Sequence, residues 1–191
     1  MKWFPDYNYI LASKSPRRQE LLESLGITFQ VKIKSVEEKY PDHLKGEAIP
    51  EYLAKLKSFP FLNELSDRDL LITADTVVFL EDELLGKPGD LAEAAFMLHK
   101  LGGKEHQVIS GVCLTSSVKQ IVFHAVTNVL FKKLREEEIQ YYLSAFQPLD
   151  KAGAYGIQEW IGNIGITHIE GSFYNVMGLP VQKLYEEILT F

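Results

Sequence analysis

The spacing of apolar residues along the chain predicts strands that alternate with helices. From Ile27 to Lys34 apolar and polar residues alternate, which is typical of a strand with one solvated face. Residues 70–80 are almost wholly apolar and predict a buried strand that only Asp75 interrupts. Further strands are predicted at 9–12, 106–114 and 120–131, the last two as a hairpin. Helices are predicted at 16–25, 50–57, 91–101, 134–146 and 181–189.

The segment 150–178 differs from the rest because it is rich in glycine and aromatic residues, and it is predicted to be a long loop. Long loops of this kind often carry functional sites. The chain has no internal repeat and no linker-like stretch, so we interpret residues 1–191 as a single α/β domain.

The first predicted helix begins with an unusual concentration of positive charge. Ser15 is a good N-cap and Pro16 suits the first helical position, yet the neighbouring Lys14, Arg17 and Arg18 crowd the positive end of the helix. Each exposed cation there costs roughly 0.3–1 kcal/mol, whereas an anion is stabilised. The segment therefore indicates either a phosphate-binding turn or a basic turn whose side chains are solvated.

Composition narrows the possible classes of protein. With 191 residues, 46% of them hydrophobic, the chain can bury a sizeable core. A net charge of −6 argues against a general nucleic-acid binder. Cys113 is the only cysteine, which leaves neither a disulfide framework nor a thiolate metal site. The sequence shows no membrane-spanning run and no signal peptide, so we expect a soluble cytoplasmic protein.

Asp75 is the acidic residue that most strongly suggests chemistry. An ionised carboxylate in an apolar strand costs several kcal/mol unless a cation, a metal ion or hydrogen bonds compensate it. The structural alternative is that the strand ends near Ala74 and that Asp75 accepts backbone hydrogen bonds in a turn. In a functional site, Asp75 would bind a divalent cation or accept a proton from attacking water, and the sequence does not choose between these roles.

Other charged residues could complete such a site, although each alone is typical of a solvated surface. Glu37 and Glu38 follow a predicted strand, from which a carboxylate can project toward a metal ion. Lys57 lies on a predicted helix, and Lys87 lies in a constrained turn. Together with the two arginines these lysines would stabilise a triphosphate. Oxygen ligands combined with phosphates favour Mg²⁺ or Mn²⁺ over zinc.

Several motifs, taken in order, give the chain a family resemblance. They are residues 11–18 (LASKSPRR), 74–76 (ADT), 86–88 (GKP), 150–158 (DKAGAYGIQ), 171–172 (GS) and 178–180 (GLP). With these motifs the sequence resembles the Maf family of nucleoside triphosphate pyrophosphatases. The resemblance implies a mixed β-sheet flanked by helices, with two lobes around a central cleft. It also implies metal-dependent hydrolysis of a nucleoside triphosphate to the monophosphate and pyrophosphate, and a homodimer.

Within the family, the residues around Asp75 and Gln158 look like the branch that acts on dTTP and UTP. The resemblance implies that Asp75 accepts a proton, that Glu38 and Asp75 hold the metal ion, and that Thr76 and Gln158 set substrate choice. It also implies that Arg17 contacts the phosphates of the substrate. We further expect Ser13, Arg18, Lys57 and Lys87 to bind substrate, and the guanidinium groups of the opening turn, residues 13–18, to share one pocket with Asp75.

The chain departs from the family pattern at Glu159-Trp160, where a glycine is common, and this departure bears on base preference. Two other functions remain as alternatives. One is a nucleotide-binding regulator of cell division without catalysis, and the other is a purine-clearing pyrophosphatase that acts on ITP or XTP.

Overall fold

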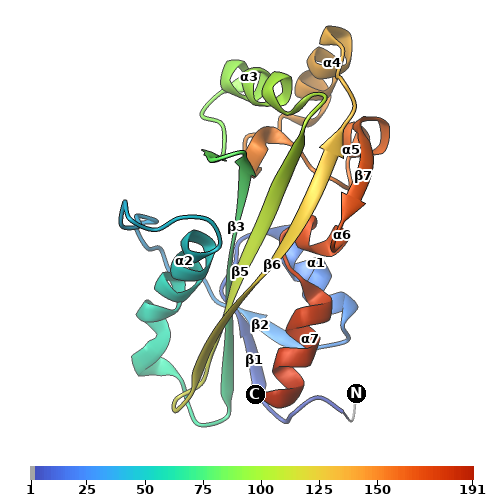
Figure 1. Cartoon of the computed structure of the whole chain (residues 1–191). Coiled ribbons are helices and arrows are strands. Elements are labelled where there is room, and N and C mark those ends of the chain that lie inside the picture. Colours follow the sequence, from blue (N-terminus) through green and yellow to red (C-terminus); the bar gives the residue numbers. More distant parts are fainter. Residues whose placement is uncertain (1–2) are drawn as a thin grey trace. The chain divides into compact units, whose positions relative to one another are not determined.

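The computed structural model describes residues 3–191, which form a mixed seven-stranded sheet flanked by helices (Figure 1). The strand order is β2-β1-β3-β5-β6-β7, and β4 pairs with β3 outside this path. The strands are β1 (Asn8–Leu11), β2 (Phe29–Val31), β3 (Asp69–Leu80), β4 (Glu83–Leu85), β5 (Glu105–Thr115), β6 (Gln120–Phe131) and β7 (Ile166–Glu170). The α-helices are α1 (Pro16–Ser24), α2 (Ala48–Ser58), α3 (Leu91–Leu101), α4 (Glu136–Phe146), α5 (Trp160–Gly165), α6 (Phe173–Met177) and α7 (Val181–Thr190). Two 3₁₀ helices complete the set, η1 (Phe59–Glu64) and η2 (Ala152–Ala154).

The chain divides into two compact units, with boundaries inside β3, β5 and β6 and a fourth boundary directly after α6. Unit 1 comprises the residues up to Thr76 together with Ser110–Ala125 and Gly178–Phe191. Unit 2 comprises Val77–Ile109 and Val126–Met177.

Unit 1 contains a topological switch point. Strand β1 is parallel to both of its neighbours, and Leu11 pairs with Val31 of β2 on one side and with Ile72 of β3 on the other. The chain passes through α1 to reach β2 and then through α2 to reach β3, so it leaves β1 toward one side and returns on the other. In open α/β sheets, ligands bind outside the carboxyl ends of the strands at such a point.

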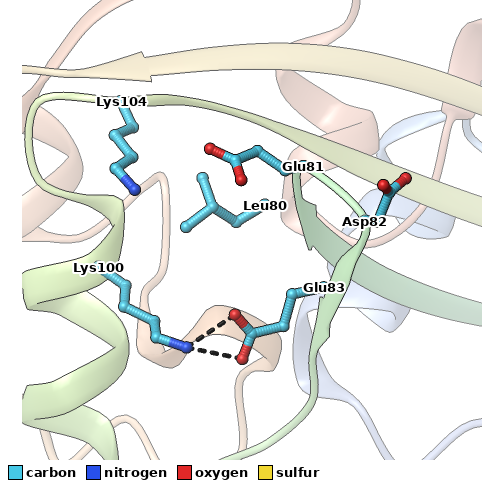
Figure 2. Close-up of a pocket in the computed structure, with 6 residues that line it drawn as sticks. All are labelled: Leu80, Glu81, Asp82, Glu83, Lys100 and Lys104. Atoms are coloured by element: carbon cyan, nitrogen blue, oxygen red, sulfur yellow. Dashed lines mark hydrogen bonds and ion pairs between the residues drawn. The ribbon is translucent and has the colours of Figure 1, made fainter.

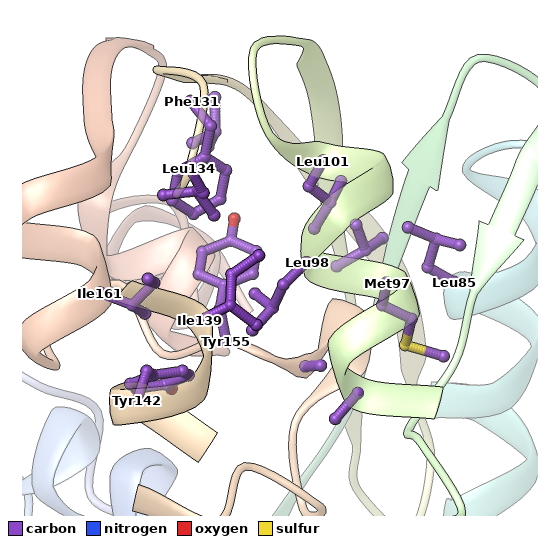
Figure 3. Close-up of a cluster of buried hydrophobic side chains, with 14 of the residues drawn as sticks. Leu85, Met97, Leu98, Leu101, Phe131, Leu134, Ile139, Tyr142, Tyr155 and Ile161 are labelled. Carbon is purple, nitrogen blue, oxygen red and sulfur yellow. The ribbon is translucent and has the colours of Figure 1, made fainter. Parts of the chain in front are cut away.

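Unit 2 holds the larger described hydrophobic cluster. Side chains from α3, α4 and the neighbouring strands meet there, among them Leu98, Leu101, Phe131 and Tyr142, each no more than 1% exposed (Figure 3). Burial of such side chains stabilises the fold by about 1.5–3 kcal/mol each. This cluster fixes α4 and the segment between α4 and α5.

Local sequence signals are confirmed where they act within a few residues. Ser15 caps α1 through its side chain, and Pro16 is the first helical residue. The hairpin predicted for β5 and β6 is confirmed by their adjacency in the sheet, with the turn closed by a 2.8 Å hydrogen bond from Ser116 N to Lys119 O. The mixed sheet implied by the family resemblance is also confirmed.

Two predictions of extent were wrong. The strand predicted from Ile27 to Lys34 covers only Phe29–Val31, because β2 lies at the sheet edge and Ile33 is 51% exposed. The long loop predicted at 150–178 contains β7 and short helices. Strand β7 exists because it pairs with β6, with Val129 opposite Ile169, and such a non-local partner leaves little trace in periodicity. Among residues 3–191, no helix combines the length and the apolar character that crossing a bilayer requires.

Candidate functional site

Asp75 lies just beyond the point where β1 and β3 separate. Their ladder ends at the Leu11–Ile72 pair, where Ala12 N donates to Ile72 O at 2.9 Å, while β3 continues to Leu80. The turn proposed as the structural alternative is therefore wrong, because Asp75 is inside a strand. The carboxylate is thus attached to a rigid element at the switch point of unit 1.

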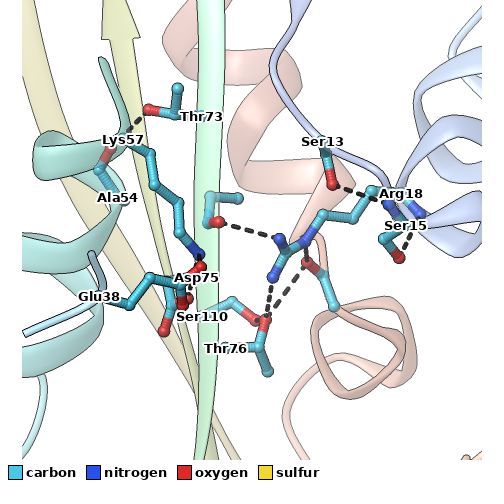
Figure 4. A network of polar contacts seen from close by, with 12 residues as sticks. Ser13, Ser15, Arg18, Glu38, Ala54, Lys57, Thr73, Asp75, Thr76 and Ser110 are labelled. Carbon is cyan, nitrogen blue, oxygen red and sulfur yellow. Dashed lines mark hydrogen bonds and ion pairs between the residues drawn. The ribbon is translucent and has the colours of Figure 1, made fainter. Parts of the chain in front are cut away.

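A lysine bridges Asp75 to a second carboxylate (Figure 4). Lys57 Nζ, from α2, lies 2.5 Å from Asp75 Oδ1 and 3.2 Å from Glu38 Oε1. Asp75 is only 8% exposed, so its charge needs this cation. Helix α2 is fixed against β3 by the hydroxyl of Thr73, which donates to Ala54 O at 2.6 Å. The structure therefore brings together three predicted site residues, one from a strand, one from a helix and one from a loop.

Arg18 makes its contacts on the other face of β3. Its Nε donates to Gly178 O at 2.8 Å, Nη1 to Ala74 O at 2.9 Å and Nη2 to Thr76 Oγ1 at 3.0 Å. Since side chains alternate along a strand, Thr76 and Arg18 lie on the α1 side, whereas Asp75 faces α2 (Figure 4). Burial lowers the pKa of Arg18, and the charge of Asp75 opposes this. The Arg18 guanidinium therefore binds protein oxygens across the strand from the Asp75 carboxylate, and the single pocket expected for the opening turn and Asp75 stays a prediction.

The opening turn is built by short-range hydrogen bonds. Ser15 N donates to the buried Ser13 Oγ at 3.2 Å, and Arg18 N approaches Ser15 Oγ at 3.5 Å. Arg17 is half-buried in the first turn of α1, next to Arg18. The start of α1 therefore lies against the Ala74–Thr76 part of β3, as the contacts of Arg18 require.

Two predicted substrate-binding residues belong to unit 2. Lys87 is exposed in the turn between β4 and α3. Gln158 precedes α5, and its Oε1 is buried without a hydrogen-bond partner among the described residues. A buried acceptor that lacks a donor is rare in native structures, and a bound ligand is one way to supply that donor.

Two residues of the site had no assigned role in the sequence analysis. Ser110 Oγ lies 2.8 Å from Thr76 Oγ1, and the carbonyl of Gly178 receives the Arg18 bond. Gly178 has a φ of 120°, which L side chains rarely adopt, and the glycine itself is the one available signal of its special conformation.

The donor set of unit 1 suits a magnesium-type ion. Among residues 3–191, no three His, Cys, Asp or Glu side chains gather as metal ligands. Glu38 and Asp75 nevertheless converge on one point, because both contact the same Lys57 ammonium. Mg²⁺ is commonly held by one or two carboxylates together with substrate phosphates, so these two residues fit such an ion.

A separate hollow of about 430 Å³ lies in unit 2 beside the turn that follows β3 (Figure 2). It is lined by Leu80, Glu81, Asp82, Glu83, Lys100 and Lys104. Lys100 Nζ pairs with both carboxylate oxygens of Glu83 at 2.7 Å. None of the predicted site residues lines this hollow.

Comparisons with known proteins agree with the motifs. The model of the family described as Maf-like protein matches residues 8–191. The dTTP/UTP pyrophosphatase of Phocaeicola vulgatus is 55% identical over 183 residues, which cover 95% of each chain. The dTTP/UTP pyrophosphatase of Bacteroides fragilis is 52% identical with the same coverage. Among solved structures, the Staphylococcus aureus Ham1 protein matches 65% of this chain and 71% of its own at 18% identity and a TM-score of 0.46. Because the family match spans nearly the whole sequence, this chain belongs to the Maf-like protein family.

Proposed function

We propose that this protein is a nucleoside triphosphate pyrophosphatase that converts dTTP and UTP to the monophosphate and pyrophosphate. Relatives with that activity in their names share 55% and 52% of its residues over 95% of the chain. The structural observation that carries the proposal is the buried Asp75 at the switch point of unit 1, linked to Glu38 through Lys57.

The proposed reaction is attack of water on the α-phosphorus. As the new P–O bond forms, Asp75 accepts a proton from the water. The bond between the α-phosphorus and the bridging oxygen then breaks, and pyrophosphate leaves with the electron pair. Lys57 supplies positive charge beside the reacting carboxylate, and Arg17, in the first turn of α1, offers a cation to the phosphates.

A divalent ion, Mg²⁺ or Mn²⁺, would be held by Glu38 and Asp75 in this proposal. When bound, it would neutralise charge on the phosphates and polarise the phosphoanhydride. Asp75 has two candidate roles, proton acceptor and metal ligand. Lys57 must then release at least one carboxylate oxygen, because its ammonium lies within 3.2 Å of both side chains.

Arg18 contributes in this proposal by holding the opening turn against β3, since three of its N–H groups already bind protein oxygens. Ser13 stabilises the same turn, and Thr76 is held by Arg18 and Ser110. Lys87 would add a cation for the phosphates.

Gln158 would recognise the base. The uracil and thymine edges present an N3–H donor beside an O4 acceptor, and a side-chain amide can accept from the first and donate to the second. The unpartnered, buried Oε1 of Gln158 supports this assignment. From the family resemblance we also propose a homodimer in the cytoplasm, which light scattering and cell fractionation would test.

Pyrophosphate release from a panel of nucleotides, with Mg²⁺ or Mn²⁺, tests the proposal. We expect turnover of dTTP and UTP, and a loss of at least about 100-fold in Asp75→Asn with the fold retained. Glu37→Gln is the matched control, because that carboxylate is exposed and pairs only with the surface Lys39 in the contacts described. Turnover of no nucleotide, or full turnover by Asp75→Asn, would refute the mechanism. Binding without turnover would favour a regulator, and preference for ITP or XTP a purine-clearing enzyme.

A further inference from the structure

The turn that carries Gln158 is closed by a single buried hydroxyl. Tyr142, on α4, accepts a hydrogen bond from Gly156 N at 3.1 Å and donates a short one to the Glu159 carboxylate. Glu159 N also donates to Gly156 O at 3.0 Å. The backbone is therefore held on both sides of Gln158, and the Tyr142 ring itself is 0% exposed.

The Glu159 carboxylate is held in place by a buried cation as well as by the hydroxyl. Its second oxygen lies 3.1 Å from Lys151 Nζ, and the Lys151 side chain is only 9% exposed. Burial and the neighbouring Glu159 raise the pKa of Tyr142, so its hydroxyl remains a donor. A Cβ at Gly156 would lie 2.7 Å from Glu159 Cδ, which shows how closely the carboxylate approaches the turn.

A glutamine needs this rigidity if it is to read a pyrimidine. The Gln158 amide can pair with uracil or thymine when its Oε1 accepts a hydrogen bond from N3–H. When the amide group rotates by half a turn, its NH₂ group can donate to N3 of cytosine equally well. Discrimination therefore depends on holding one amide orientation, since the wrong base then leaves buried polar groups unpaired. In the structure Gln158 Oε1 is buried and has no hydrogen-bond partner among the described residues.

We propose that Tyr142 and Glu159 are positioning residues that fix the Gln158 amide and so determine the choice of uracil and thymine over cytosine. This inference rests on the proposed pyrophosphatase function. The hydrogen bond between Tyr142 and Glu159 fastens the turn that carries Gln158 to α4.

The test is the ratio of kcat/KM for dTTP to that for dCTP. Tyr142→Phe keeps the buried ring and removes the hydroxyl, and we expect the ratio to fall at least about tenfold. Gln158→Ala should lower the ratio by at least as much. The double variant Tyr142→Phe/Gln158→Ala should have the same ratio as Gln158→Ala alone, because the Tyr142 hydroxyl acts through the Gln158 amide. Glu159→Gln is a second variant, expected to lower the ratio even where Tyr142→Phe fails to fold.

Tyr141→Phe is the matched control, since Tyr141 is an exposed neighbour on the same helix, and its ratio should equal that of the wild type. An equal fall in kcat/KM for both nucleotides would show a merely structural role and overturn the inference. A wild-type ratio near one, or a ratio that Gln158→Ala lowers while Tyr142→Phe and Glu159→Gln do not, would also overturn it. Failure of the wild type to hydrolyse dTTP or UTP would refute the proposed function instead.

Discussion

Replacing Lys57 with methionine should expose the electrostatic cost of Asp75. Methionine keeps much of the unbranched side chain and removes the ammonium, so the packing of α2 changes little while two carboxylates lose their shared cation. Asp75 is 8% exposed and cannot recover full hydration, whereas the Glu38 side chain is 48% exposed and can. The penalty should therefore come chiefly from Asp75.

The distances set the size of this effect. At an effective dielectric constant of about 20, unit charges 2.5 Å apart attract by about 7 kcal/mol, most of which offsets the cost of desolvating both groups. Breaking a buried ion pair from one side typically costs about 3–5 kcal/mol. Because the Lys57 side chain is still 16% exposed, we expect the lower end, about 3 kcal/mol, or a fall in Tm of about 6–12 °C.

Calorimetry of four proteins tests the reasoning: wild type, Lys57→Met, Asp75→Asn and the double variant. The double variant should regain at least half of the stability lost in Lys57→Met, because the neutral amide introduced by Asp75→Asn no longer needs a cation. Lys39→Met is the matched control, since the Lys39–Glu37 pair is exposed and should contribute less than about 1 kcal/mol. A loss below about 1 kcal/mol in Lys57→Met, or a double variant as unstable as the single one, would show that Lys57 does not compensate Asp75.

Two further predictions concern stability. Burial lowers the pKa of His106 from 6.5 to about 4, so between these pH values the unfolded chain binds more protons than the folded chain. The free energy of unfolding should therefore decrease by about 3 kcal/mol as the pH is lowered through this range. Melting curves from pH 7 to pH 4 would show this loss, and His106→Gln should make stability depend less on pH. An unchanged pH dependence in this variant would show that other groups cause the loss. Gly111→Ala should destabilise by about 3 kcal/mol, because the new Cβ would lie 2.3 Å from the Pro50 carbonyl. Urea titration would measure this against Gly86→Ala, where no atom lies within 4 Å, and equal midpoints for the two variants would contradict it.

The sequence predicted best what depends on neighbours along the chain. Ser15 and Pro16 specified the start of α1 because capping and the fixed φ of proline act within one turn. The apolar run around Asp75 specified a buried strand, and an isolated acid there required a partner. Lys57 was named as a site residue, but its contact with Asp75 needed coordinates, because helix periodicity gives a face and not a distance.

What the sequence could not show depends on where strands stop. Nothing local indicates that β1 ends its pairing at Ile72 while β3 continues, so the face on which Arg18 lies could not be deduced. The Tyr142 hydroxyl is hidden for a similar reason, since it joins Gly156 and Glu159 across 14 and 17 residues of sequence. Short elements such as β7 depend on a distant partner strand and so resemble loop when the sequence is taken alone.

The end of the β1 ladder explains why Arg18 and Asp75 occur together on opposite faces of one strand. Between the end of the β1 ladder at Ile72 and the start of the β4 ladder at Val78, Arg18 Nη1 donates to the carbonyl of Ala74 in place of a strand partner. The planar guanidinium simultaneously binds Thr76 and Gly178, which a lysine with one nitrogen could not do in this geometry. The neighbouring Asp75 side chain points to the α2 face of the same strand, where it pairs with Lys57 (Figure 4). Arg18 therefore takes the place of a strand partner at the edge of β3, while Lys57 compensates the charge of Asp75 on the face toward α2.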